Sequence, residues 1–219
     1  MNEPGTPHRD KGSRTEATSP SFSDAKVRHR RLPHWESGEA VYFVTFRLAD
    51  SLPQSLLRSL AAQRADILAT AKAAGRELSP GERRLLARLF SRRVERYLDA
   101  GSGACYLGKP GIAELIARAL LHFDGSRYTL FAWCVMPNHV HVVFRPDGGE
   151  TLADIVHSWK SFTSNAANHR LGRSGRFWQR EYYDHQVRSG EEFSRIVRYV
   201  AENPLRAGLQ NWRWAAVHI

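Results

Sequence analysis

Residues 136–144 read Met-Pro-Asn-His-Val-His-Val-Val-Phe and combine a pair of histidines with the apolar pattern of a β-strand. Two histidines, His139 and His141, are separated by one valine in a run that is otherwise β-branched and apolar. Successive side chains of a strand point to opposite faces, so His139 and His141 share one face while Val140 and Val142 share the other. The spacing therefore predicts two imidazoles side by side, close enough to bind one metal ion. The alternative is a half-buried strand whose polar face happens to carry histidine.

The elements predicted around this strand alternate between strands and helices. In chain order they are a strand at 41–48, a helix at 110–123, strands at 128–135 and 139–145, a helix at 151–170, a strand at 182–188 and a helix at 191–203. Thr151, with Asp154 three residues later, is expected to begin the second helix, and Pro204 is expected to end the last one. The order β-α-β-β-α-β followed by an extra helix predicts an α+β fold. It corresponds to the ferredoxin-like split βαβ arrangement, an antiparallel sheet with helices on one face.

Two segments lie outside this core pattern. Residues 1–30 consist of Pro, Ser, Thr, Gly and charged residues with one large apolar anchor, Phe22, so they are predicted to form a disordered tail that precedes a domain at 31–219. Helices predicted at 54–74 and 81–100 form a helical insertion at about 53–100. Arginines of the second helix give it a basic surface that either holds a DNA backbone or is simply solvated: Arg83, Arg84, Arg88, Arg92, Arg93 and Arg96.

Composition narrows the class of partner. The 219 residues carry a net charge of +10, which favours a polyanion, with nucleic acid as the first candidate; a generically basic soluble protein is the alternative. The two cysteines, Cys105 and Cys134, are far apart, which argues against a disulfide framework or a zinc knuckle. No apolar run approaches a membrane span and the N-terminus lacks the apolar core of a signal peptide, so a cytoplasmic protein with no membrane partner is expected.

The last predicted helix has a regular apolar stripe with two polar residues at its edge. The stripe follows i, i+3, i+4 and i+7 spacing and consists of Phe193, Ile196, Val197 and Val200. Tyr199 lies at its border, and Asn203 follows one turn later on the same edge. In the functional interpretation, the Tyr199 phenol points to the histidine strand and Asn203 offers an amide oxygen to the same metal. In the alternative, the tyrosine merely packs, with its hydroxyl in water.

Two motifs taken together resemble a known family. The first is the Met-Pro-Asn-His-Val-His segment at 136–141, and the second is Tyr-Val-Ala-Glu-Asn-Pro-Leu-Arg-Ala-Gly-Leu at 199–209. A third segment between them, Phe-Trp-Gln-Arg-Glu-Tyr-Tyr-Asp-His at 177–185, adds to this resemblance. With these motifs the sequence resembles the IS200-like, REP-associated tyrosine transposases, which are single-tyrosine HUH nucleases. The resemblance runs from about residue 31 to residue 209.

The resemblance implies a ferredoxin-like catalytic domain, a divalent metal (Mg²⁺ or Mn²⁺) and single-stranded or hairpin-containing DNA as the partner. It implies His139 and His141 as metal ligands, with Asn203 or His185 completing the set. It implies Tyr199 as the nucleophile, which attacks a phosphodiester to leave a 5′-phosphotyrosine link and a free 3′-hydroxyl. The implied activity is that of a single-stranded DNA endonuclease and strand transferase, that is, a transposase, working as a monomer or homodimer.

Further side chains are candidates for DNA contacts. Five cations are expected near backbone phosphates: Lys160, Arg180, Arg188, Arg195 and Arg198. Three aromatic residues either stack on unpaired bases or pack in the core: Trp159, Phe177 and Trp178. Tyr182 and Tyr183 are rival nucleophiles, but adjacent residues of a strand point to opposite faces.

Two competing functions remain to be separated. A nucleotide hydrolase of the histidine-triad kind needs a third histidine at the next alternate position, where this sequence has Val143. A domesticated, non-mobile protein that binds hairpin DNA without cutting it is the other alternative. Metal-dependent cleavage of a single-stranded hairpin oligonucleotide distinguishes these interpretations.

Overall fold

The computed structural model describes residues 40–82, 85, 94 and 97–218. The tail predicted at residues 1–30 and the domain boundary at residue 31 lie outside these ranges. The arginines of the predicted basic surface also lie outside the described residues: Arg83, Arg84, Arg88, Arg92, Arg93 and Arg96.

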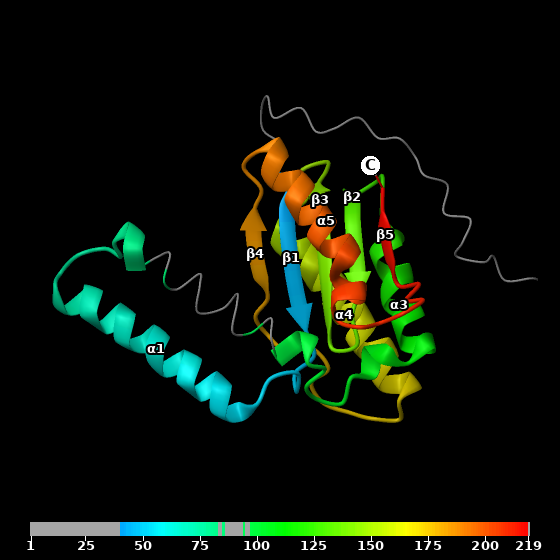
Figure 1. The fold of residues 1–219 in the computed structure, drawn as a ribbon, viewed down its shortest axis with the longest axis horizontal. Coiled ribbons are helices and arrows are strands. Elements are labelled where there is room, and N and C mark those ends of the chain that lie inside the picture. The colour runs from blue at the N-terminus through cyan, green and yellow to red at the C-terminus, as the bar shows by residue number, and fades with distance from the viewer. Residues whose placement is uncertain (1–39, 83–84, 86–93, 95–96, 219) are drawn as a thin grey trace, which may run out of the picture.

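A five-stranded antiparallel sheet forms the centre of the molecule (Figure 1). Its strands lie in the order β4 (Tyr183–Gln186), β1 (Tyr42–Arg47), β3 (His139–Pro146), β2 (Tyr128–Val135) and β5 (Ala215–Val217). Without β5, the 3₁₀ helix and the helical insertion, the chain order is the predicted β-α-β-β-α-β followed by one more helix, and the α+β fold class is confirmed. The short strand β5 was not predicted; it pairs with the outer edge of β2, where Ala132 lies opposite Val217.

Helices α3 (Pro110–Leu121) and α4 (Leu152–Arg170) cover one face of the sheet. A one-turn 3₁₀ helix, η2 (Tyr106–Gly108), leads into α3. Thr151 caps α4 as predicted, because its hydroxyl accepts a hydrogen bond from the backbone N–H of Asp154 at 3.1 Å. The core of this face includes Trp159, Phe177 and Trp178, which are 3%, 1% and 4% exposed. Core packing, rather than stacking on DNA bases, is therefore the role of these three side chains.

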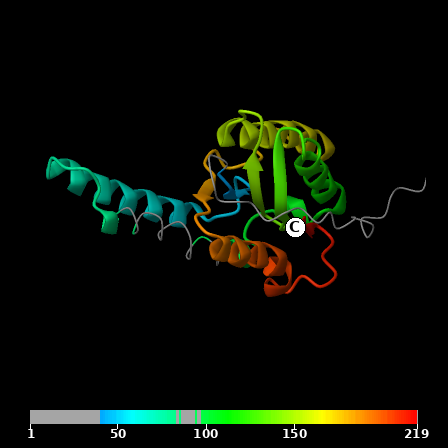
Figure 2. The same cartoon turned by 90° about the horizontal axis from the view of Figure 1, so that it is seen from above.

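Helix α5 (Gly190–Arg206) covers the opposite face, where it packs on β2, β3 and β5 (Figure 2). The prediction that Pro204 ends this helix is wrong, since Pro204 lies inside α5, which continues to Arg206. Proline in the last turn removes only the hydrogen bond that its missing N–H would make to the carbonyl four residues earlier. The following turn closes normally, because the N–H of Ala207 donates to the carbonyl of Asn203 at 3.0 Å.

The helical insertion leaves the body of the domain. Helix α1 (Gln54–Ala73) projects away from the sheet beyond the β4 edge (Figures 1 and 2). Two of its buried side chains, Leu56 and Leu60, form a small cluster with Val94 and Leu98 from the second predicted helix. Among the described residues, no helix is long and apolar enough to cross a membrane.

Candidate metal and nucleophile site

The two histidines of β3 lie between the sheet and α5. Both are 1% exposed, and alternation along the strand puts them on the face that carries Val143, while Val140 and Val142 face α3 and α4. Their rings meet edge to face, with 4.6 Å between centroids and 3.0 Å between the two Nε2 atoms. The two Nε2 atoms therefore converge on one point, as the spacing predicts.

A chain of hydrogen bonds orients the first imidazole. Asn138 is buried, and its Nδ2 donates to the carbonyl of Ser102 at 2.9 Å, which turns its Oδ1 toward His139 Nδ1 at 2.7 Å. An amide oxygen can only accept a hydrogen bond, so Nδ1 of His139 carries the proton. The lone pair of His139 Nε2 is consequently left facing His141.

A hydroxyl holds the second imidazole. Thr45 on β1 lies directly opposite His141, and its Oγ1 is 2.8 Å from His141 Nδ1. A hydroxyl can donate or accept, so Thr45 supports either tautomer of His141. In the metal-free protein His141 can donate from Nε2 to His139, and with a cation present both Nε2 lone pairs become available. Hydrogen bonds of this kind to the second ring nitrogen are typical of metal-binding histidines.

Burial keeps both imidazoles neutral. It lowers the pKa of His141 to about 3. It lowers the pKa of His139 well below its ordinary value, and the neighbouring His141 adds to this shift. Neutral imidazole is the form that binds a metal ion.

Tyr199 lies beside this pair on α5. Its ring packs edge to face against His141 with 5.4 Å between centroids and against Phe43 at 6.0 Å. The Arg206 guanidinium, about two turns further along the helix, lies 5.6 Å from the centroid of the Tyr199 ring. The helix thus presents the predicted nucleophile to the histidine face, with a cation nearby.

Asn203 is buried on the same helix, one turn after Tyr199. It is 3% exposed, and no group among the described residues donates a hydrogen bond to its Oδ1. Because α5 runs opposite to β3 (Figure 1), the step from Tyr199 to Asn203 follows the direction from His141 to His139. A buried amide oxygen without a donor is costly, and a cation would satisfy it.

The donor set fits a divalent cation. Two nitrogen ligands about 2.1 Å from an octahedral ion and at right angles to each other are about 3.0 Å apart, which matches the separation of the two Nε2 atoms. The described residues contain no group of three His, Cys, Asp or Glu side chains that could hold a metal ion. The buried Oδ1 of Asn203, which lacks a hydrogen-bond partner among these residues, is the candidate third ligand. The two imidazole nitrogens suit Mn²⁺ better than Mg²⁺, which prefers oxygen, while an amide oxygen suits either ion.

His185, the alternative third ligand, is held elsewhere. Its Nε2 lies 3.0 Å from Oε1 of Glu192 on α5, while the backbone N–H of Arg188 donates to Oε2 of the same carboxylate at 2.8 Å. His185 therefore joins β4 to the start of α5.

The rival tyrosines separate as strand geometry predicts. Tyr182 packs against the core on the α3 and α4 side, whereas Tyr183 packs on the α5 side, 6.2 Å from the Phe43 ring. Burial, together with Asp184 and Glu181, raises the pKa of Tyr182 and so disfavours its phenolate.

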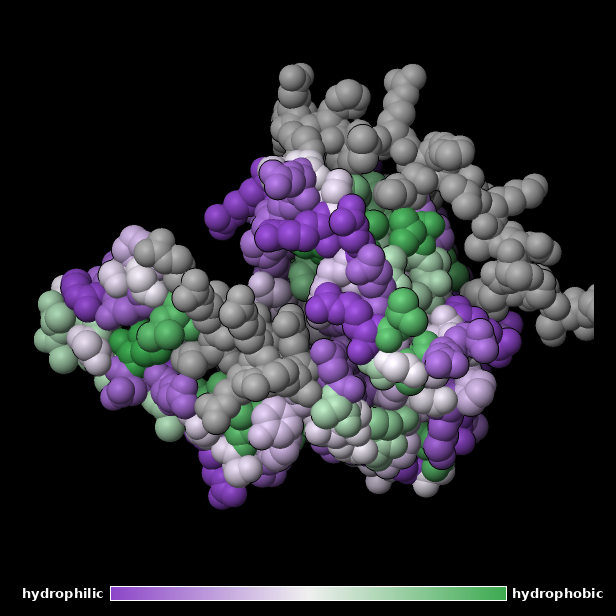
Figure 3. Space-filling model, viewed as in Figure 1, coloured by the Kyte–Doolittle hydropathy of each residue, from purple (hydrophilic) through white to green (hydrophobic). Residues whose placement is uncertain are grey.

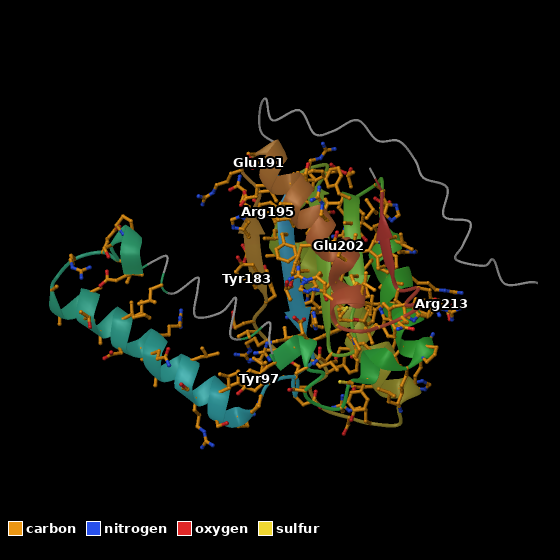
Figure 4. All side chains as sticks on the ribbon, viewed as in Figure 1. Tyr97, Tyr183, Glu191, Arg195, Glu202 and Arg213 are labelled. Carbon is orange, nitrogen blue, oxygen red and sulfur yellow. The ribbon has the colours of Figure 1, made fainter. Side chains whose placement is uncertain are left out.

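The predicted DNA-contacting cations fall into two groups. Lys160 is half-buried near one end of β4, where its Nζ donates to the carbonyl of Arg180 at 2.7 Å; the side chain of Arg180 is exposed. Arg188, Arg195 and Arg198 are exposed around α5, whose outward face is hydrophilic (Figure 3). Arg195 and Glu202 lie along this helix (Figure 4), and Arg195 also contacts Glu192 at 3.3 Å.

Four further residues belong to this site that the sequence did not predict: Thr45, Arg47, Asn138 and Arg206. Asn138 and Arg206 lie inside the motifs at 136–141 and 199–209, so their place in these motifs was the sequence feature that could have identified them. Thr45 and Arg47 carried no such signal, because their position beside the histidines depends on the pairing of β1 with β3.

Comparisons with known proteins agree with these motifs. A family model described as "Transposase IS200 like" matches residues 112–203. A REP-associated tyrosine transposase of Escherichia coli (strain K12) is 22% identical over 111 residues, which cover 48% of this chain and 64% of the relative. The chain thus spans less than two thirds of that relative's length.

A solved structure also matches, that of a REP-associated tyrosine transposase bound to a REP hairpin. The alignment covers 81% of this chain and 76% of that one, with 14% identity and a TM-score of 0.40. The family model spans β3 and most of α5, and therefore both histidines, Tyr199 and Asn203. The family model and the Escherichia coli relative confirm the resemblance predicted from the sequence: this chain is similar to the IS200-like transposases, and specifically to the REP-associated tyrosine transposases.

Proposed function

We propose that this protein is a metal-dependent single-stranded DNA endonuclease and strand transferase that acts on hairpin-containing DNA through a tyrosine nucleophile. The observation that carries the proposal is the position of Tyr199, whose ring lies 5.4 Å from that of His141 beside two convergent, neutral imidazoles. The similarity to IS200-like transposases and the net charge of +10 support DNA as the substrate.

His139, His141 and Asn203 would hold the divalent cation, Mg²⁺ or Mn²⁺. When bound, such an ion supplies Lewis-acid polarisation of a phosphoryl oxygen. Asn138 keeps the proton of His139 on Nδ1, and Thr45 can accept the proton of His141 Nδ1, so that both Nε2 lone pairs face the site.

The Tyr199 hydroxyl would attack the phosphorus of a phosphodiester. An O–P bond to Tyr199 forms as the bond between phosphorus and the 3′-oxygen breaks, and the phenol's proton is balanced by the one that the 3′-oxygen takes up. The products are a 5′-phosphotyrosine link and a free 3′-hydroxyl, which can later reverse the reaction on the same or another strand. Phe43 and His141 would hold the attacking ring in place through their edge-to-face contacts.

Replacing Tyr199 by phenylalanine tests the proposal. Tyr199→Phe removes one hydroxyl, so folding and DNA affinity should survive while cleavage and the covalent protein–DNA adduct disappear. Denaturing gels with a labelled hairpin oligonucleotide and Mn²⁺, followed by peptide mass mapping, measure both products.

Tyr183→Phe is the matched control, because Tyr183 also packs against Phe43 on the α5 side of the sheet. An adduct on Tyr182 or Tyr183, or one that persists in Tyr199→Phe, would assign the nucleophile elsewhere. Tight binding of the hairpin by the wild type without any adduct would favour the non-mobile binding protein instead.

A further inference from the structure

A cavity of about 490 Å³ adjoins the histidine site at the edge of the sheet. Thr45 and Arg47 of β1 line it together with Tyr182 and Tyr183. The rest of its lining includes Arg64 and Leu98 of the insertion and two carboxylates, Glu181 and Asp184. Figure 4 shows Tyr183 on β4, on the side of the sheet nearer to α1. Because Thr45 also contacts His141, the cavity and the histidine site share one wall.

Arg47 is the cation of this cavity that lies nearest the histidines in the sheet. It is directly opposite His139 in the β1–β3 register and on the same face as Thr45. Paired residues of neighbouring antiparallel strands are about 5 Å apart, so the stem of Arg47 begins next to His139.

The Arg47 guanidinium is partly buried but makes few of the ion pairs and hydrogen bonds that would offset the loss of hydration. Burial lowers its pKa to about 10, and no carboxylate among the described residues forms an ion pair with it. Within the same residues it donates to one side chain, the Ser51 hydroxyl, from Nη1 at 3.2 Å. A guanidinium has five N–H donors, so most of its hydrogen-bonding capacity is available to a ligand.

A second cation lies close to Arg47. Burial lowers the pKa of Lys160, Glu181 acts in the opposite direction, and the positive charge of Arg47 lowers it further. Lys160 Nζ is also 5.5 Å from the centroid of the Tyr182 ring. Glu181 and Asp184 of the cavity lining are exposed to solvent, so water screens their charges, whereas Arg47 and Lys160 are partly desolvated. Two partly desolvated cations that repel each other beside a cavity favour an anion there.

We propose that Arg47 binds a phosphodiester of single-stranded DNA, and that the cavity beside it holds the attached nucleotide next to the Tyr199 and histidine site. The planar fork of arginine matches two phosphate oxygens, and the two tyrosine rings offer apolar surface to a base. This inference rests on the proposed function and adds to it a substrate-binding residue outside the family motifs.

Arg47→Met and Arg47→Lys test the proposal, with Arg118→Met as control. Arg118 is an exposed arginine of α3 on the far face of the sheet, where it pairs with Glu114 at 2.6 Å. The probe is a fluorescein-labelled single-stranded oligonucleotide containing a hairpin, and its binding is measured by anisotropy at several salt concentrations in EDTA. Thermal unfolding without DNA and calorimetric titration with Mn²⁺ are measured on the same variants.

Arg47→Met should bind the oligonucleotide about tenfold more weakly, because it lacks one charge-assisted phosphate contact. The slope of log K against log[salt] should fall by about 0.7, the value for one phosphate contact on a single strand. Arg47→Lys should recover part of the affinity, and Arg118→Met should behave as wild type. Without DNA the melting temperature of Arg47→Met should equal or exceed that of wild type, since methionine keeps the apolar stem and removes a buried charge, and Mn²⁺ affinity should not change.

Wild-type affinity and salt slope in Arg47→Met would overturn the proposal. So would a lowered melting temperature or lost Mn²⁺ binding in that variant, because either result would make Arg47 a structural residue. If the wild type forms the Tyr199 adduct while Arg47→Met binds DNA normally, the inference about Arg47 fails and the proposed function stands. If no adduct forms but Arg47→Met still weakens binding, the phosphate site stands and the proposed cleavage fails.

Discussion

At the scale of single residues, the candidate site is made of polar side chains that are buried away from water. His139, His141, Asn138 and Asn203 are all at most 3% exposed, so each polar atom needs a partner within the protein or on a ligand. Asn138 has two such partners, whereas Asn203 Oδ1 has none among the described residues. This difference separates a residue that orients the site from one that is available to a ligand.

The buried imidazoles should make the metal-free protein sensitive to acid. The folded-state pKa of His141 is about 3, against about 6.5 in the unfolded chain, so between these values the unfolded state binds more protons. The stability that this neutral, buried histidine contributes is therefore fully present above about pH 6.5 and is lost progressively as the pH falls toward its folded-state pKa. Between pH 6.5 and 5, one such histidine lowers the free energy of unfolding by about 2 kcal/mol.

Urea unfolding in EDTA at pH 7 and pH 5 measures this loss. His139→Gln/His141→Gln should lose less stability than wild type over the same interval, because glutamine does not titrate. Equal losses in the two proteins would mean that the imidazoles are hydrated and titrate normally in the folded state.

Asn203 should weaken the metal-free fold and strengthen the metal-bound one. Leucine has nearly the same size without the orphan amide, so Asn203→Leu should raise the melting temperature in EDTA, where an unsatisfied polar group costs about 1–3 kcal/mol. The same variant should bind Mn²⁺ more weakly by calorimetry, and His139→Ala/His141→Ala should abolish binding. A destabilised Asn203→Leu protein with wild-type Mn²⁺ affinity would give Asn203 a purely structural role.

At the scale of elements, α5 decides where Tyr199, the proposed nucleophile, lies. Its buried stripe, which includes Phe193, Val197 and Val200, holds the helix on the sheet. Its start is tied down twice, by the Ser189 hydroxyl that accepts from the N–H of Glu192 at 3.1 Å and by the contact of Glu192 with His185. These contacts fix the rotation of the helix and hence the direction of Tyr199.

Removing the cap of α5 should destabilise the domain. Ser189→Ala leaves one N–H of the first turn without its partner, which lowers the free energy of unfolding by about 1 kcal/mol. Urea denaturation measures the change, and Ser158→Ala, in the middle of α4, serves as the control at a helical position without a capping role. A loss in Ser158→Ala as large as that in Ser189→Ala would argue against the capping account.

At the scale of the whole molecule, the layout of the sheet and helices and the net positive charge both bear on DNA binding. The sheet separates a face closed by α3 and α4 from a face where α5 covers the histidines, and α1 projects beyond the β4 edge (Figure 2). The net charge of +10 gives the molecule a field that attracts a polyanion from a distance.

Affinity for hairpin DNA should fall steeply with salt. Each phosphate that the protein neutralises releases condensed counterions, so log K should decrease linearly with log[salt]. Fluorescence anisotropy between 50 and 200 mM salt, about the range over which such contacts are resolved, measures the slope. A slope near zero would exclude phosphate contacts as the main source of binding.

Local periodicity was enough to predict the order of the elements, the shared face of His139 and His141 and the buried stripe of α5. The apolar and polar side chains behind these features alternate with a period of two residues in strands and 3.6 in helices, so a short stretch of sequence is enough to detect them. The end of α5 was mispredicted, because a proline in the last turn interrupts only one hydrogen bond and the helix continues past it.

Only the tertiary structure decided which side chains surround the histidines. Thr45 lies opposite His141 and Arg47 opposite His139 although more than 90 residues separate each pair along the chain, and a shift of one residue in the β1–β3 register would turn both to the other face. The register is set by burial on both faces of the sheet at once, which no local pattern contains. For the same reason the sequence alone left three tyrosines in competition, and packing on the folded sheet placed Tyr182 on the face away from the histidines and Tyr199 against His141.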